Sequence, residues 1–111
     1  MYIYKVKLVK VIDGDTSDLE VDLGFRTYVE DRFRLYGINT PERGKPGYKE
    51  ATDFCKQWFA NNAGIAYIKS FKPYRDKYGR YLVALYKDDT LTGQSLNDEL
   101  VQANLAVVYF P

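Results

Sequence analysis

Apolar and polar residues alternate along the first twelve positions of the chain, a period of two that predicts a β-strand. Tyr4, Val6 and Leu8 fall on one face of this strand, and lysines stand between them. The alternation shifts further along, because Lys10 would otherwise join the apolar face. We therefore expect a β-bulge near Val9.

Four later segments are rich in β-branched and aromatic residues and also predict strands. The first of them contains Gly24, which we expect at the bend of a hairpin. Another turn signal, Asp13 followed by Gly14, ends the first strand. The four segments are Leu19–Val29, Arg32–Ile38, Ile65–Phe71 and Tyr81–Tyr86.

A helical period appears after a loop that is rich in proline and glycine. Apolar residues there recur three and four positions apart, which predicts one buried face of a helix ending at Asn61–Gly64. Its face consists of Ala51, Phe54, Cys55, Trp58 and Phe59.

A second helix is predicted near the end of the chain, running through Ala103. Ser95 with Asp98 three residues later is a capping box for its start. Asn104 suits the left-handed residue that would close it.

Five strands with a helix after the third are typical of the OB-fold, a barrel architecture that binds nucleic acid. The sequence therefore predicts a mainly β protein with α (α+β), in which two helices accompany a five-stranded barrel. Its 111 residues suffice for one hydrophobic core and are too few for two. We expect a single domain over residues 1–111.

Composition narrows the chemistry. The net charge is only +1, so the chain is not a broadly basic nucleic-acid binder. It contains no histidine, so acid–base chemistry must use carboxylates, lysines, tyrosines or metal-bound water. The one cysteine, Cys55, cannot form an internal disulfide, and we expect it in the core. No apolar run approaches membrane-spanning length and no signal peptide precedes the first strand, so we expect a cytoplasmic protein, or a secreted one if a leader has been removed.

Three short motifs, on loops between the predicted strands, carry the candidate chemistry. Together they offer oxygen ligands for a hard cation, a carboxylate base and two guanidinium groups. Cleavage of a phosphodiester needs such an inventory. The motifs are Asp13–Thr16, Arg34–Glu42 and Asp76–Arg80.

These motifs, in this order, make the chain similar to the staphylococcal nuclease (thermonuclease) family, from Lys5 to about Tyr109. The family's Asp-Gly-Asp-Thr, Arg-Leu to Thr-Pro-Glu, and Asp-Lys-Tyr-Gly-Arg signatures are all present. Three signatures at compatible spacing make a chance likeness improbable. The resemblance implies a staphylococcal-nuclease-like OB-fold and calcium-dependent hydrolysis of DNA, RNA or both, with little sequence specificity.

The resemblance also implies a calcium site. Asp15, Asn39 and the backbone carbonyl of Thr40 would ligate the ion, and Asp13 would reach it through water. Calcium takes several hard oxygen ligands in irregular geometry, which these groups supply. Asn39 stands where the family's type enzyme has a second aspartate. The site therefore lacks one formal negative charge, and we expect weaker calcium binding.

For catalysis the resemblance implies Glu42 as the general base that activates water. Arg34 and Arg80 would grip the scissile phosphate, because a guanidinium fork can hold two phosphate oxygens at once. All three side chains should then converge on one pocket mouth, with the metal ligands on the adjoining wall. Contacts to the bound strand are expected from Lys77, Tyr78 and Tyr109.

Each residue also has a plainer interpretation. The Asp13–Asp15 segment could be an ordinary turn, Arg34 a partner in a surface ion pair, and Glu42 a solvated acid. A calcium-binding EF-hand loop is excluded, because its closing glutamate would fall at Gly24. The three motifs together favour catalysis.

Two function classes stay open. One is the nuclease; the other is a nuclease-like OB-fold that binds single-stranded nucleic acid or protein without cutting. A pure binding module has no use for Glu42 between Arg34 and Arg80, so the enzyme is favoured. We expect nucleic acid as partner, single-stranded DNA or RNA preferred, no membrane, and a monomer or a dimer.

Overall fold

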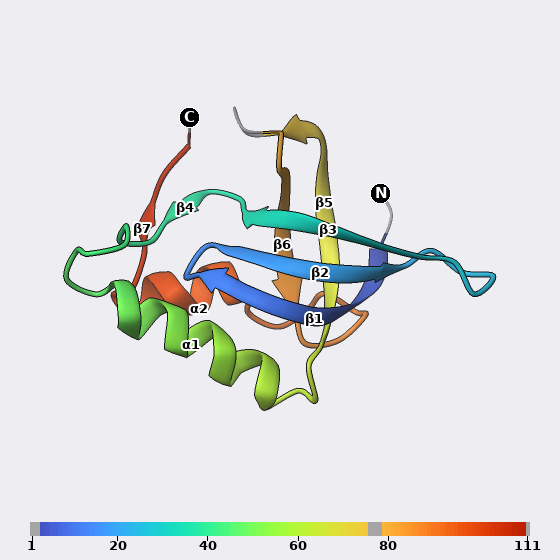
Figure 1. The fold of residues 1–111 in the computed structure, drawn as a ribbon, viewed down its shortest axis with the longest axis horizontal. Helices are drawn as coiled ribbons and strands as arrows, with labels where there is room; N and C mark the ends of the chain where they lie inside the picture. The colour runs from blue at the N-terminus through green and yellow to red at the C-terminus, as the bar shows by residue number, and fades with distance from the viewer. Residues whose placement is uncertain (1–2, 76–78, 111) are drawn as a thin grey trace.

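The computed structural model describes residues 3–75 and 79–110, without the side chains of residues 70–75. Its centre is a closed barrel with the strand order β1-β2-β3-β6-β5, and both helices lie on one side of it (Figure 1). The barrel strands are β1 Ile3–Asp13, β2 Thr16–Asp22, β3 Tyr28–Leu35, β5 Ile65–Arg75 and β6 Tyr81–Tyr86. The remaining elements are β4 Ile38–Asn39, α1 Tyr48–Ala60, α2 Leu96–Gln102 and β7 Val107–Val108. This architecture confirms the predicted α+β barrel with two helices.

The predicted bulge lies in β1, where the register with β2 shifts between Leu8 and Lys10. Because of the extra residue, Val6 and Val11 are both buried although they are an odd number of positions apart. Val9, the residue at the irregularity, is about half exposed. Because of the bulge, Val11 at the end of the strand still faces the core, and the turn that follows lies against α1.

The predicted strand Arg32–Ile38 is wrong in its bounds. In the structure β3 starts earlier, at Tyr28, and pairs with β2 from Asp22↔Tyr28 to Thr16↔Arg34. The strand ends at Leu35, since Gly37 adopts a φ of 81° in the turn that follows. Residues 38 and 39 form β4, which pairs with β7 instead of the barrel.

A parallel pair closes the barrel. Residues Phe33, Arg34 and Leu35 of β3 pair with residues 81–83 of β6, whereas the other barrel pairs are antiparallel. This pairing brings the end of β3 beside the start of β6. Arg34 lies in β3 and Arg80 immediately precedes β6. The pairing therefore brings together the backbones of two residues that are far apart in sequence.

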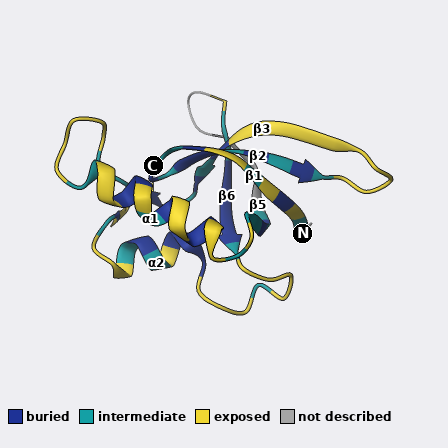
Figure 2. Cartoon of the chain, turned by 60° about the horizontal axis from the view of Figure 1, so that its bottom comes forward, coloured by how far each residue is buried: buried dark blue, intermediate teal, exposed yellow. Residues whose placement is uncertain are grey.

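Helix α1 buries the face that its spacing predicted. Ala51, Cys55, Trp58 and Phe59 are buried in the core, and Phe54 packs partly buried at its border. Buried and exposed stretches alternate along this helix in Figure 2. No helix in the described part of the chain is long and apolar enough to cross a membrane.

Helix α2 ties the barrel to the segment that leads into β4. Its start is capped as predicted, since the backbone N–H of Asp98 donates to Ser95 Oγ over 3.1 Å. The buried Asn97 accepts from Leu85 N over 3.3 Å and donates to the carbonyl oxygen of Tyr36 over 2.9 Å. This one side chain therefore bridges β6 and the turn before β4. Asn104 closes the helix with a φ of 60°, as expected.

Candidate active site

The turn between β1 and β2 is packed against α1. A Cβ atom on Gly14 would lie 2.7 Å from Ala51 Cβ and 2.9 Å from the side chain of Thr40. The thiol of Cys55 donates to the carbonyl oxygen of Gly14 over 3.0 Å. Helix α1 therefore fixes the position of the two aspartates that flank this glycine.

Asp15 is the centre of a hydrogen-bond network. Its Oδ1 accepts from Thr16 Oγ1 over 3.1 Å. Its Oδ2 accepts from the backbone N–H of Thr40 over 3.2 Å and from Arg34 Nη2 over 3.3 Å. The Arg34 and Asp15 side chains are only 15% and 13% exposed, so this ion pair is partly shielded from water.

Arg34 reaches across the site from the end of β3. Its Nη2 also donates to Asn39 Oδ1, and its Nη1 donates to the carbonyl oxygen of Leu35 over 3.2 Å. One guanidinium thus joins the oxygens of Asp15 and Asn39, two of the three expected direct calcium ligands. Oxygen atoms from the β1–β2 turn and from β4 converge on this positive charge.

Arg80 approaches the same turn from the residue before β6. Its Nη1 donates to Thr16 Oγ1 over 3.2 Å. The hydroxyl of Thr16 thus accepts from Arg80 while donating to Asp15. The two guanidinium groups are therefore linked through Thr16 and Asp15 in one network.

Asp13 is a half-buried carboxyl beside this network. Its Oδ1 accepts from the backbone N–H of Asp15 over 3.2 Å. Burial, followed by the neighbouring Asp15 carboxylate, raises the pKa of Asp13 to about 6. A cation near this half-buried pair of carboxyl groups would stabilise their ionised forms.

Glu42 takes no part in the hydrogen-bond network that joins Arg34 to Arg80 in the described residues. It is exposed in the loop before α1, where its carbonyl oxygen accepts from the backbone N–H of Lys45 over 3.0 Å. Within the described residues its carboxylate has no hydrogen bond or ion pair. Hydrogen bonds thus bring together Arg34, Arg80, Asp15, Asn39 and Thr40, whereas no side-chain contact in the described part of the chain ties Glu42 to them.

The expected substrate contacts are only partly described. Lys77 and Tyr78 lie outside the described residues. Tyr109 is 46% exposed, and its backbone N–H donates to the carbonyl oxygen of Gly37 over 2.8 Å. The β4–β7 pair, in which Val107 lies opposite Asn39, therefore places Tyr109 opposite Gly37.

The donor set fits a hard cation. Carboxylate, amide and backbone carbonyl oxygens are the groups that calcium prefers, and Asp13, Asp15, Asn39 and Thr40 offer them. Within the described residues no cluster of three or more His, Cys, Asp or Glu side chains could hold a metal. The site would therefore rely on neutral oxygens beside its two carboxylates.

The comparisons with known proteins identify the family. Residues 32–111 match the family model described as staphylococcal nuclease homologue. The chain belongs to the staphylococcal nuclease family. This confirms the resemblance drawn from the three motifs, two of which lie within the matched region.

Three relatives of this family member are identical to it at about a third of the aligned positions. A thermonuclease of Staphylococcus hyicus is 32% identical over 94% of this chain. A thermonuclease of Staphylococcus intermedius is 34% identical over 86% of it, and an uncharacterized protein of Methanocaldococcus jannaschii is 31% identical over 96%. This chain spans only 59%, 55% and 59% of those proteins, respectively.

Sequence reasoning gave Thr16 no place in the candidate site. Its hydroxyl is the link between Arg80 and Asp15, and the residue is 3% exposed. The signal was available, because Thr16 is the last residue of the Asp-Gly-Asp-Thr motif. Its role needs a hydroxyl that donates to one neighbour while accepting from another.

Proposed function

We propose that this chain is a calcium-dependent nuclease that hydrolyses phosphodiester bonds in single-stranded DNA or RNA with little sequence specificity. One observation carries the proposal: Arg34 and Arg80 are linked through Asp15 and Thr16 in a partly buried network. A surface that merely attracts nucleic acid does not need two guanidinium groups fixed beside a carboxylate.

The arginines act on the phosphate. Guanidinium groups fixed before the reaction stabilise the negative charge that develops on phosphate oxygens, without reorganising at that moment. Arg34 is 15% exposed, so its interaction with a phosphate is less screened than at an open surface. On substrate binding Arg34 exchanges part of its contact with Asp15 and Asn39 for the phosphate.

The oxygens that Arg34 now contacts would hold the calcium ion. Asp15, Asn39 and the carbonyl of Thr40 would be direct ligands, and Asp13 would contribute through water. Bound calcium supplies positive charge that neutralises the phosphate. The all-oxygen donor set and the half-buried Asp13–Asp15 pair support this assignment.

Glu42 is proposed as the general base. Its exposed carboxylate lies two residues beyond Thr40, on the same loop as the candidate ligands. Catalytic hydrogen bonds are often long or absent before substrate binds and tighten in the complex. The Glu42 carboxylate, which has no hydrogen bond within the described residues, is therefore expected to gain one to the attacking water when a strand is bound.

A cleavage assay on single-stranded DNA and RNA tests the proposal. The protein is incubated with calcium, with magnesium, or with excess chelator, and products are resolved on a denaturing gel. We expect cleavage only with calcium. Glu42→Gln should lower turnover by about 10²–10⁴-fold and leave strand affinity nearly unchanged, as removal of a general base does. Glu30→Gln, an exposed acid on β3, is the matched control and should cleave as the wild type does.

Two results would overturn the nuclease. Full cleavage in chelator contradicts the metal requirement, and wild-type turnover of Glu42→Gln contradicts its role as base. Binding of single strands without cleavage under any divalent ion would instead favour the binding module. Asn39, which replaces a charged ligand, is the feature that would explain that outcome.

A further inference from the structure

The hairpin of β2 and β3 projects beyond the barrel (Figure 1). Its strands stay paired as far as Asp22↔Tyr28, and the backbone N–H of Leu23 donates to the carbonyl of Thr27 over 2.9 Å. A further bond, from Thr27 N to the carbonyl of Gly24 over 2.9 Å, closes the tip. The ladder therefore holds the tip in an extended position.

The tip presents a phenyl ring to solvent in a strained turn. Phe25 and Arg26, its two central residues, have φ values of 52° and 59°, and Phe25 is 103% exposed. A turn of this type favours Asn and Gly, because bulky side chains crowd the backbone at positive φ. An exposed aromatic residue at a strained position indicates a functional constraint on the tip.

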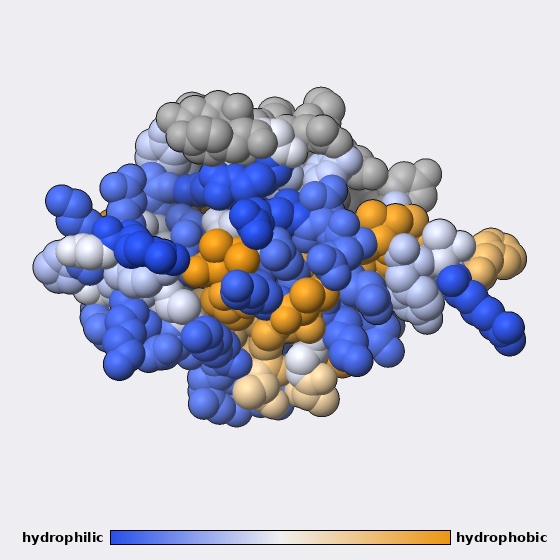
Figure 3. All heavy atoms as spheres, viewed as in Figure 1, coloured by the Kyte–Doolittle hydropathy of each residue, from blue (hydrophilic) through white to orange (hydrophobic). Residues whose placement is uncertain are grey.

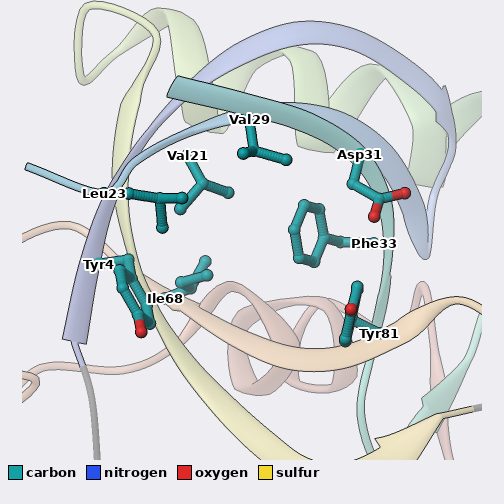
Figure 4. Close-up of a pocket in the computed structure, with 8 residues that line it drawn as sticks. All are labelled: Tyr4, Val21, Leu23, Val29, Asp31, Phe33, Ile68 and Tyr81. Carbon is teal, nitrogen blue, oxygen red and sulfur yellow. The ribbon is translucent and has the colours of Figure 1, made fainter. Parts of the chain in front are cut away.

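A cavity lies at the mouth of the barrel, beside the base of the hairpin (Figure 4). Its volume is about 150 Å³. Apolar cavities of about 150 Å³ bind benzene, so one phenyl ring matches this space. Side chains from the inner faces of the barrel strands line it: Tyr4, Val21, Leu23, Val29, Asp31, Phe33, Ile68 and Tyr81.

Asp31 is the one charged residue of this lining. It shares the inner face of β3 with Val29 and Phe33, and it pairs across the sheet with the fully buried Leu19. Its carboxylate accepts only from the adjacent backbone N–H of Arg32, over 2.8 Å, and has no ion pair within the described residues. The cavity therefore suits an aromatic ring that is followed by a cation.

Phe25 and Arg26 offer that pair of groups, and the fully exposed Phe25 ring does not occupy the cavity of its own chain. We propose that two copies of this chain form a two-fold dimer through their β2–β3 hairpins. The Phe25 ring of each copy occupies the barrel-mouth cavity of the other, and each Arg26 pairs with the partner's Asp31. A two-fold axis makes both contacts reciprocal, as in isologous dimers.

Two further features support a second copy as the occupant. Leu23 and Val29, which line the cavity on the side of the tip, are 45% and 44% exposed, and a second hairpin would cover them. Figure 3 shows hydrophobic residues at the base of the hairpin and again at its tip. The charged residues of the two strands and the tip are mostly acidic, which disfavours nucleic acid at this surface: Asp18, Glu20, Asp22, Glu30 and Asp31 against Arg26, Arg32 and Arg34.

The dimer leaves the candidate active site open. Phe25, Arg26 and Asp31 take no part in the network that joins Arg34, Asp15, Thr16 and Arg80, so the dimer contacts and the candidate active site use different side chains. The dimer and the proposed nuclease are therefore independent. Cleavage by monomeric hairpin variants should match the wild type.

Sedimentation velocity of the full chain tests the proposal. Protein concentrations from about 1 μM to about 1 mM cover weak to moderate dissociation constants. We expect a concentration-dependent dimer. Phe25→Asn should remain monomeric while melting at or above the wild-type temperature, since Asn tolerates positive φ. Arg26→Asp and Asp31→Arg should each raise the dissociation constant by about tenfold or more, because both contacts become repulsive. Glu30→Arg, on the opposite face of β3, should dimerise as the wild type does.

A mixture of the two charge-reversed variants tests the proposed Arg26–Asp31 pairing directly. Arg26→Asp and Asp31→Arg each dissociate alone, but an equimolar mixture should form heterodimers, since both reciprocal pairs are then oppositely charged. A wild type that stays monomeric throughout overturns the proposal. So does a dimer that Phe25→Asn leaves intact, or a failure of the mixture to associate. If the wild type stays monomeric, the role of Asp31 would be that of an inward-pointing charge that prevents β3 from pairing with a strand of another chain.

Discussion

Substitution of Gly14 by alanine tests whether α1 sets the position of the candidate metal ligands. The new methyl group would lie 2.7 Å from Ala51 Cβ and 2.9 Å from both Cγ2 and Oγ1 of Thr40. Favourable carbon–carbon contacts lie at about 3.5–4.0 Å. The turn or the helix must therefore move by roughly 1 Å to admit it.

The cost follows from this overlap. Overpacking a filled site destabilises by about 1–3 kcal/mol, and Gly14 and Ala51 are both buried. For a chain of this size each kcal/mol lowers the melting temperature by roughly 4 °C, so we expect a loss of about 4–12 °C. Asp15 moves with the turn, and a displacement of about 1 Å at a reacting centre can lower activity by about 10²-fold.

Thermal unfolding followed by circular dichroism measures the stability, and the cleavage assay measures the activity. Gly93→Ala is the matched control, because nothing lies within 4 Å of a Cβ at that position. Ala51→Gly removes the nearest contact, so the double variant with Gly14→Ala should lose less stability than the two single losses added together. Wild-type melting of Gly14→Ala, or strict additivity in the double variant, would refute the reasoning.

Three further substitutions or treatments test separate contacts. Asn39→Asp should tighten calcium binding by about tenfold or more in isothermal titration, because it restores a ligand charge; unchanged affinity would remove Asn39 from the ligand set. Asn97→Ala should cost about 2–4 kcal/mol in chemical denaturation, since Leu85 N and the carbonyl of Tyr36 lose a partner; a loss below about 1 kcal/mol would contradict the bridge. Burial raises the pKa of Cys55 to about 12, so iodoacetamide should modify this thiol only in the unfolded chain, as mass spectrometry would show; rapid labelling of the folded protein would contradict its burial.

Local signals in the sequence determined much of the secondary structure. The bulge near Val9 follows from a break in alternation, and the buried stripe of α1 follows from helical spacing. Ser95 and Asn104 mark the start and the end of α2 through capping chemistry. Such features depend on neighbours along the chain, so the amino-acid order alone contains them. The three motifs likewise identified the family.

Pairing across the chain decided the rest. Alternation could not show that β3 begins at Tyr28 or that β3 and β6 run parallel, because a strand's bounds depend on the partner that extends it. Nor could it show that Thr16 connects Arg80 to Asp15, or that the thiol of Cys55 holds the Gly14 turn. These contacts join residues distant in sequence, and only closure of the barrel against α1 brings them within hydrogen-bonding distance.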